Sequence, residues 1–194
     1  MPTLFIVRHG RAAAGWDTAA DPPLDDIGRA QARTAATSLM KKLQGGDVAS
    51  IDVVSSPLRR CRETAEVFEL AAGATTRIEP LIAEIPSPVG VEMGDRVTWL
   101  RRVMQGTWTE LAENEGAMYA EFHAGLVGWA RGLSRDTVAF SHFVAINALI
   151  GVALDDDRLV IRSLDNASIT VLRIGAGGAM TLVEGGSEAD TLIR

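Results

Sequence analysis

Leu4-Phe5-Ile6-Val7-Arg8-His9-Gly10 is an apolar run that ends directly in two basic side chains and a glycine. Four consecutive apolar residues are typical of a strand buried on both faces, as in the parallel sheets of α/β proteins. Such sheets bind their ligands at the carboxyl ends of the strands. The stretch therefore predicts a central strand that delivers His9 to a ligand site.

A second histidine repeats this arrangement far along the chain. His142 follows the strand-like run Thr137-Val138-Ala139-Phe140-Ser141, and the sequence contains three histidines in all. Taken alone, a histidine ahead of an apolar helix is more often a buried structural or capping residue than a catalytic one. The parallel with His9 favours chemistry at both positions.

Short apolar runs and helical patterns alternate between and around these two strands. This alternation predicts a three-layer α/β/α fold with a mostly parallel central sheet, closed by a carboxyl-terminal hairpin. Asp25 or Asp26 can cap the first helix and Gly45-Gly46 can stop it, whereas Ser56-Pro57 is expected to open the second. The expected strands are 3–7, 51–54, 77–82, 137–141, 168–174 and 179–183, and the expected helices outside the insertion are 26–43, 56–72 and 143–154.

The pattern changes between residues 85 and 133. A loop rich in proline and glycine is followed by two helical stretches, 95–114 and 117–133, with no strand between them. We interpret the 194 residues as a single domain, 1–194, with a helical cap inserted at about 85–133. Loops that overhang a site usually determine which substrate it accepts, so the cap is where substrate choice is expected.

Composition excludes several classes of protein. The net charge of −6 argues against non-specific binding to nucleic acid or to an anionic membrane, and no stretch is long enough to span a bilayer. Cys61 is the only cysteine and falls on the apolar face of its helix, which favours a core residue over a nucleophile. With no recognisable secretion signal in the sequence, we expect a cytoplasmic protein; the oligomeric state stays open.

Four basic side chains are predicted to meet at the carboxyl edge of the sheet. His9 can act as a nucleophile, Arg8 supplies positive charge, and Gly10 allows backbone amides to approach an anion. Arg60 opens the helix after the second strand and lies away from that helix's apolar stripe, so it can serve a ligand. With His142, these groups suit the charged oxygens of a phosphoryl group.

Four ordered motifs resemble those of the histidine phosphatase, or phosphoglycerate mutase-like, superfamily. The resemblance implies that His9 is transiently phosphorylated while Arg8, Arg60 and His142 hold the phosphoryl oxygens, with no metal and no cofactor. It also implies a proton-donating carboxyl group, which corresponds best to Glu84, with Glu92 as the second choice. The motifs are Arg8-His9-Gly10, Pro23-Leu24-Asp25-Asp26-Ile27-Gly28-Arg29-Ala30-Gln31-Ala32, Ser56-Pro57-Leu58-Arg59-Arg60-Cys61-Arg62-Glu63-Thr64-Ala65 and Ser141-His142.

The sequence departs from the family pattern at several positions. Phe143 and Asn147 stand where many relatives carry Gly and Arg; the Phe143 amide can still donate to phosphate, although the ring would narrow the pocket. Arg11 and Trp16 replace residues of a polar loop, and Arg11 either reaches the phosphate or faces solvent. Further candidates for substrate contact lie in the cap: Arg101, Arg102, Trp99 and Trp108, although packing is the favoured explanation for the two tryptophans.

We expect a metal-independent phosphomonoester hydrolase of the histidine acid-type, acting on a small phosphorylated molecule or a phosphoprotein. A phosphoglycerate-type mutase is the nearest alternative, but the compact chain offers little material for the lid that a mutase needs. A non-catalytic phosphate-binding regulatory module of the same fold is the third hypothesis. Asp155-Asp156-Asp157 is interpreted as a solvated loop, not as a metal site.

Overall fold

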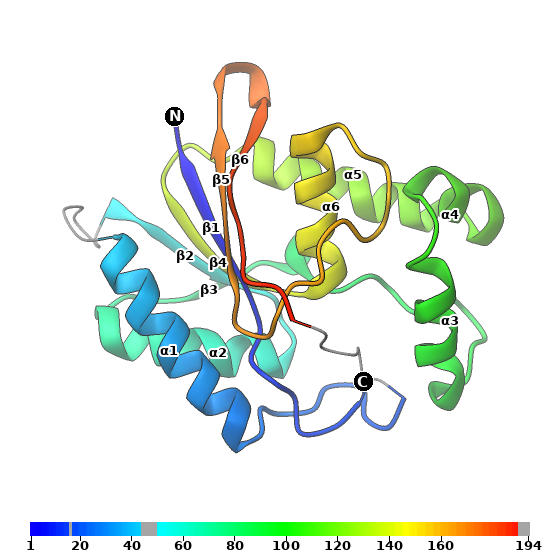
Figure 1. The fold of residues 1–194 in the computed structure, drawn as a ribbon, viewed down its shortest axis with the longest axis horizontal. Coiled ribbons are helices and arrows are strands. Elements are labelled where there is room, and N and C mark those ends of the chain that lie inside the picture. The colour runs from blue at the N-terminus through cyan, green and yellow to red at the C-terminus, as the bar shows by residue number, and fades with distance from the viewer. Residues whose placement is uncertain (16, 44–49, 190–194) are drawn as a thin grey trace.

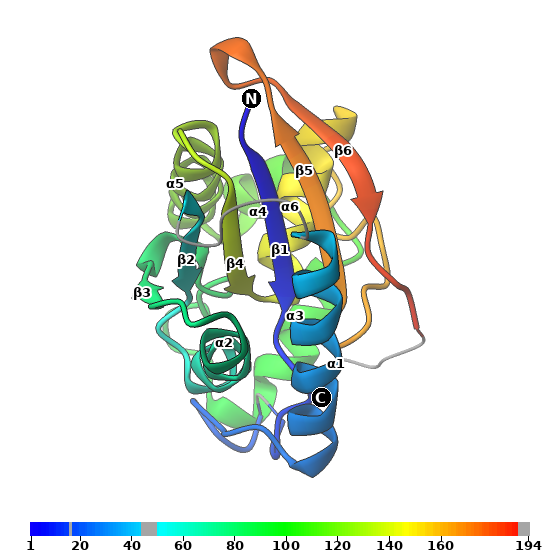
Figure 2. The ribbon, with the colours of Figure 1, turned by 90° about the vertical axis from the view of Figure 1, so that its left-hand side faces the viewer.

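The structure is a computed structural model that describes residues 1–15, 17–43 and 50–189, and it contains a six-stranded sheet in the order β3-β2-β4-β1-β5-β6 (Figures 1 and 2). The first four of these strands run parallel, whereas β5 is antiparallel to β1 and β6 is antiparallel to β5. The α/β class and the mostly parallel sheet are confirmed. The strands are β1 (Thr3–Arg8), β2 (Asp52–Ser55), β3 (Arg77–Ile78), β4 (Thr137–Ser141), β5 (Ile169–Ile174) and β6 (Met180–Gly185).

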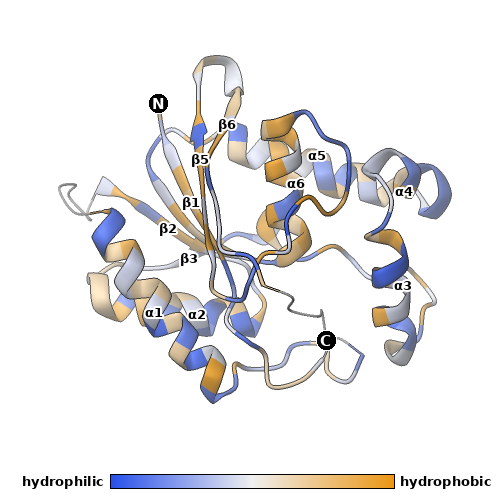
Figure 3. Cartoon of the chain, viewed as in Figure 1, coloured by the Kyte–Doolittle hydropathy of each residue, from blue (hydrophilic) through white to orange (hydrophobic). Residues whose placement is uncertain are grey.

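Helices cover both faces of the sheet, and the sheet divides the core into two parts. Along β1, Leu4 and Ile6 point into the core beneath α5 and α6, while Phe5 and Val7 point into the core beneath α1 and α2. This two-sided burial explains the unbroken apolar run of the sequence, and Figure 3 shows β1 and most of α6 as hydrophobic. The helices are α1 (Asp26–Lys42), α2 (Arg59–Ala72), α3 (Arg96–Val103), α4 (Trp108–Glu115), α5 (Met118–Arg131) and α6 (Phe143–Leu154).

Helices α1 and α2, which cover the same face of the sheet, are capped in different ways. Asp25 caps α1 as expected, accepting a hydrogen bond from the Gly28 amide at 2.7 Å. The expected start of α2 at Ser56-Pro57 is wrong, because α2 begins at Arg59 and its N-cap residue makes no side-chain bond. Asp21 supplies the cap from a distant loop, its Oδ1 accepting from the Arg59 amide at 2.6 Å. Gly45-Gly46 lies outside the described residues.

The first helical stretch expected in the insertion, 95–114, is broken in two. A short 3-10 turn, Met93–Asp95, leads into α3, and a new helix, α4, begins after Thr107. Thr107 and Glu110 form a reciprocal capping box at this start, and the Leu159 amide donates to the Gly106 carbonyl. The loop after α6 therefore stabilises the break.

The second stretch forms α5, which packs against α6 on the same side of the sheet (Figure 1). Trp99 and Trp108 are both about 95% buried in this part of the core, so packing explains them, as favoured above. Trp99 stacks on Tyr119 and Trp108 on Phe122. Arg102 links α3 to α4 through an ion pair with Glu115.

The β3 edge of the sheet was predicted less accurately than the rest of the sheet. The strand expected at 77–82 ends at Ile78, because Pro80 has no amide to donate to a ladder and opens a 3-10 turn, Pro80–Ile82. The hairpin of β5 and β6 is confirmed, with Gly177 and Gly178 at positive φ in its turn. Within the described ranges, every helix is too short or too polar to cross a membrane.

Candidate functional site

His9 and His142 are brought together by the register of two neighbouring strands. Arg8, the last residue of β1, pairs with Ser141, the last residue of β4, so the residue after each strand lies at the same sheet edge. The His9 amide donates to the Ser141 carbonyl at 3.0 Å. The two imidazole centroids are 5.2 Å apart at an interplanar angle of 63°.

Arg60 bridges the two imidazoles from the first turn of α2. Its Nε donates to His9 Nε2 at 3.1 Å, and its Nη2 lies 3.2 Å from His142 Nδ1. Arg60 is only 6% exposed, so its charge lies inside the site and not in bulk solvent. The expected convergence of Arg60 with both histidines is present in the structure.

The hydrogen bonds of His9 determine which of its nitrogens can react. Nδ1 lies 2.8 Å from the Gly10 carbonyl oxygen, which only accepts, so Nδ1 carries the proton. Nε2 therefore keeps its lone pair. Burial, followed by the charges of Arg60 and Arg8, holds the pKa of His9 well below its ordinary value. His9 is thus a neutral imidazole with a defined tautomer, as a nucleophile requires.

His142 has the opposite tautomer. Arg60 can only donate, so His142 Nδ1 accepts, and its Nε2 donates to Ser56 Oγ at 2.8 Å. Burial is the main cause of the lowered pKa of His142, with further contributions from Arg60, His9 and Arg8. The sequence motif contained Ser56, but its role as the partner of His142 was missed because a cap of α2 was expected there.

Arg8 is the second buried cation of the site. It is 5% exposed, its Nη1 donates to the Leu164 carbonyl, and its Cζ lies 5.0 Å from the centroid of the Phe143 ring. Burial lowers the pKa of Arg8 to about 10, although Glu84 and Asp165 oppose the shift. Among the described residues, Arg8 Nε has no hydrogen-bond partner, so the site contains a buried donor suited to an anion.

Glu84 lies close enough to Arg8 and Arg60 for their charges to act on it. Its side chain is half-buried, and its Oε1 accepts from the Ile85 amide at 3.0 Å. Burial raises the pKa of Glu84, while the Ile85 amide and the charge of Arg60 oppose the shift. A carboxyl group with a raised pKa beside two buried cations can donate a proton. Glu92, the second choice, is exposed directly before the 3-10 turn Met93–Asp95.

The structure requires glycine at position 10 for a different reason from the one expected. Its amide donates to Thr64 Oγ1 at 3.0 Å instead of remaining available for an anion. A Cβ on Gly10 would lie 2.4 Å from the Gly28 carbonyl oxygen, so the turn after β1 packs directly on the first turn of α1. Glycine is required for this close approach.

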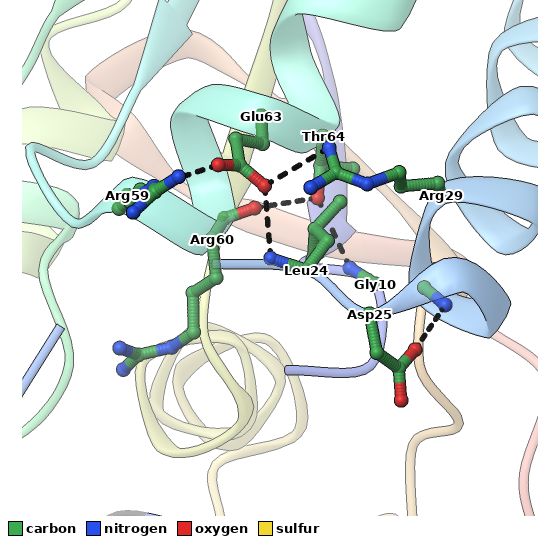
Figure 4. A network of polar contacts seen from close by, with 9 residues as sticks. Gly10, Leu24, Asp25, Arg29, Arg59, Arg60, Glu63 and Thr64 are labelled. Carbon is green, nitrogen blue, oxygen red and sulfur yellow. Dashed lines mark hydrogen bonds and ion pairs between the residues drawn. The ribbon is translucent and has the colours of Figure 1, made fainter. Parts of the chain in front are cut away.

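Glu63 and Thr64 fasten this turn and its neighbours to α2 (Figure 4). Glu63 Oε2 accepts from the Leu24 amide at 2.8 Å, and Oε1 accepts from Arg59 Nε at 2.7 Å. The Thr64 hydroxyl accepts from Gly10 and donates to the Arg60 carbonyl at 2.7 Å. Thr64 thus joins the segment that carries His9 to the turn that carries Arg60, a role that the sequence analysis missed.

Thr64→Val is expected to lower the free energy of unfolding by about 1–3 kcal/mol, because it leaves the buried Gly10 amide without a partner. Thr37→Val is a matched control: the Thr37 hydroxyl also donates to the carbonyl four residues earlier, but it is exposed. Urea unfolding of the two variants measures the difference. Equal losses in both would mean that the Gly10 contact contributes nothing.

The remaining candidates are not gathered around the two histidines. Arg11 was expected either to reach the phosphate or to face solvent. It instead forms an ion pair with Asp25, its Nε lying 2.6 Å from Oδ2. Arg101 and Arg102 are exposed on α3, and Arg102 is engaged by Glu115. Trp16 lies outside the described residues. In the described part of the chain, no group of three or more acidic, histidine or cysteine side chains could hold a metal ion.

Cys61 and the acidic loop are structural, as interpreted from the sequence. Cys61 is fully buried, its thiol donates to the Ser141 carbonyl at 3.3 Å, and burial raises its pKa. Asp156 pairs with Arg158 at the surface, and Asp157 Oδ2 accepts from the Thr109 amide at the start of α4. These contacts account for Cys61, Asp156 and Asp157 as parts of the fold.

Comparison with solved structures shows that the fold is a known one. A mycobacterial glucosyl-3-phosphoglycerate phosphatase matches with a TM-score of 0.70 at 21% identity, covering 97% of this chain and 100% of that one. A phosphoserine phosphatase from Entamoeba histolytica, in complex with 3-phosphoglyceric acid, matches with a TM-score of 0.69 at 20% identity, covering 96% and 98%. A phosphoglycerate mutase from Thermus thermophilus matches with a TM-score of 0.62 at 22% identity, covering 96% and 99%.

These neighbours include both phosphatases and a mutase, and at these identities the likeness concerns the fold. A search of curated protein sequences gave no match. The family profile described as histidine phosphatase superfamily (branch 1) matches residues 4–184, which is nearly the whole chain and includes every residue of the cluster described above. The chain belongs to the histidine phosphatase superfamily.

Proposed function

We propose that this protein is a metal-independent phosphomonoester hydrolase that works through a phosphohistidine on His9. The observation that carries the proposal is the tautomer of His9: Nδ1–H is held by the Gly10 carbonyl, and the lone pair of Nε2 lies in a buried site with two guanidinium groups. Transfer of a phosphoryl group from an anionic ester requires a neutral nucleophile surrounded by positive charge.

In the first step, the His9 Nε2 lone pair attacks phosphorus and the ester P–O bond breaks. The leaving oxygen takes the proton of Glu84, so the alcohol departs neutral. Arg60 donates to His9 Nε2 in the structure, and the incoming phosphoryl group must replace that bond. The guanidinium then has a phosphoryl oxygen as its acceptor and remains in place to stabilise the transferring charge.

In the second step, water attacks phosphorus while the Glu84 carboxylate takes its proton. The P–N bond breaks, which releases inorganic phosphate and restores neutral His9. The charge of the bound phosphate dianion raises the pKa of His142, so His142 Nδ1 can take a proton from solvent and donate it in a hydrogen bond to a phosphoryl oxygen. Ser56 keeps the imidazole oriented throughout, since it holds the opposite nitrogen.

The experiment is to trap the intermediate. The protein is mixed with radiolabelled para-nitrophenyl phosphate and quenched into alkaline detergent, because phosphohistidine is stable in alkali and labile in acid. We expect label on the parent protein and none on His9→Ala. Turnover by the parent without trapped label, or equal label on both proteins, would overturn the mechanism. A parent with neither turnover nor label would be a binding module.

The phosphoglycerate mutase among the structural neighbours keeps a second activity under consideration. A mutase returns the phosphoryl group to its substrate, whereas a hydrolase releases it to water. Incubation with 3-phosphoglycerate therefore separates the two, with free phosphate expected and the isomeric phosphoglycerate as the contrary result. Phosphoserine belongs in the same panel, because a structural neighbour is a phosphoserine phosphatase.

A further inference from the structure

Phe143, the first residue of α6, forms part of the wall around Arg8. Phe143 is 6% exposed and Arg8 5% exposed, and Arg8 Cζ lies 5.0 Å from the ring centroid. A guanidinium within about 6 Å of an aromatic centroid is attracted by the ring quadrupole, and the attraction is strongest where water is excluded. Phe143 therefore holds one face of Arg8.

The edge of the same guanidinium is held from another segment. Arg8 Nη1 donates to the Leu164 carbonyl, while Nε has no hydrogen-bond partner among the described residues. Two contacts thus fix the plane of the guanidinium and leave one buried donor unpaired. A buried donor without a partner is costly, so this arrangement favours a ligand that brings an oxygen to it.

Asn147, one turn along α6 from Phe143, fixes the segment that leads to Leu164. Its Oδ1 accepts from the Ile161 and Arg162 amides at 2.9 and 2.8 Å. Its Nδ2 donates to the Phe143 and Arg162 carbonyls at 3.0 and 3.1 Å. The fully buried amide group thereby uses both donors and both acceptor positions.

We propose that Phe143 and Asn147 are positioning residues for Arg8: the Phe143 ring orients the guanidinium plane, and Asn147 holds the segment whose Leu164 carbonyl fixes the guanidinium edge. The result is a preoriented Nε donor for a phosphoryl oxygen. The inference rests on the proposed function only in requiring that Arg8 binds the phosphoryl group. It gives a joint role to the two residues that depart from the family pattern after His142.

The test is a set of binding measurements with inorganic phosphate by titration calorimetry. Phe143→Leu is expected to weaken phosphate binding about tenfold, because it removes a buried cation–π contact. Phe143→Tyr keeps the ring face and should bind phosphate as the parent does. Phe68→Leu is the matched control, since Phe68 is fully buried in α2 and its ring packs at a tilt of 46° against Phe140 instead of against a cation. It should lower stability and leave phosphate affinity unchanged.

Double variants that include Arg8 distinguish positioning of the guanidinium from a general effect on packing. In an Arg8→Ala or Arg8→Lys background, Phe143→Leu and Asn147→Ala should cause little further loss of phosphate affinity, because the plane that they orient is gone. Equal losses with and without the Arg8 guanidinium, or no measurable phosphate binding by the parent, would overturn the inference. Failure to trap a phosphohistidine in a parent that binds phosphate would instead count against the proposed function alone.

Discussion

Replacing His9 by alanine is expected to lower the turnover of para-nitrophenyl phosphate by roughly ten-thousandfold or more, the scale seen when a covalent nucleophile is removed. We expect neither of the other two histidines to substitute, because His142 Nε2 is engaged by Ser56 and the His123 ring packs on Trp108. Steady-state release of nitrophenol measures the loss. The variant should remain folded, since His9 contributes no large apolar side chain to either core.

Arg59→Ala is the matched control for general damage to the site. Arg59 neighbours Arg60 in the first turn of α2, but its side chain is half exposed and pairs with Glu63. Its removal should leave kcat within a few-fold of the parent, because the Arg59 side chain pairs with Glu63 at the surface. The loss of such an exposed ion pair also costs little stability. If His9→Ala kept turnover comparable to Arg59→Ala, phosphoryl transfer through His9 would be excluded.

The sequence predicted the cluster because its members follow strands that end at the same edge of the sheet. His9 and His142 each follow a strand, the two strands are parallel neighbours, and Arg60 follows a third. These relations depend on apolar runs and on the parallel topology, which are local or general properties. Cys61 was placed in the core by helical periodicity for the same reason.

What the sequence could not predict depends on contacts between distant segments. Asp21 caps α2 across 38 positions, and that contact cannot be inferred from the residues next to the helix. Leu164 contributes a carbonyl group to Arg8, and backbone carbonyls carry no residue-specific signal. Thr64 was visible in the motif, yet its role depends on the close approach of Gly10 to α1.

Glu84→Gln is expected to separate the two steps of the reaction. With an alkyl phosphate such as phosphoserine, the leaving oxygen needs a proton, so kcat should fall by about 10²–10⁴-fold. With para-nitrophenyl phosphate the leaving phenolate is stable without one, so the first step should persist while attack by water is slowed. Stopped-flow measurement should then show a burst of about one nitrophenol per active site before a slow steady state.

The pH profile provides a second readout for the same residue. Burial raises the pKa of Glu84, so its acid form persists to higher pH than that of an ordinary carboxyl group, and alkyl phosphate cleavage should fall as pH rises through that raised value. Burial and Arg60 lower the pKa of His9, so the nucleophile stays neutral to a pH below the usual histidine range. As pH rises, the rate of alkyl phosphate cleavage should therefore fall because Glu84 loses its proton, while His9 remains neutral.

Glu84→Gln should remove this alkaline decline, because the side chain no longer titrates. Glu92→Gln tests the second choice, whose exposed position predicts an unchanged profile. A burst and a lost alkaline decline in Glu92→Gln, with Glu84→Gln behaving as the parent, would assign the proton-donating role to Glu92. A carboxyl group held near Arg8 and Arg60 by burial is the better donor, because the same two cations stabilise the carboxylate that remains once the proton has left.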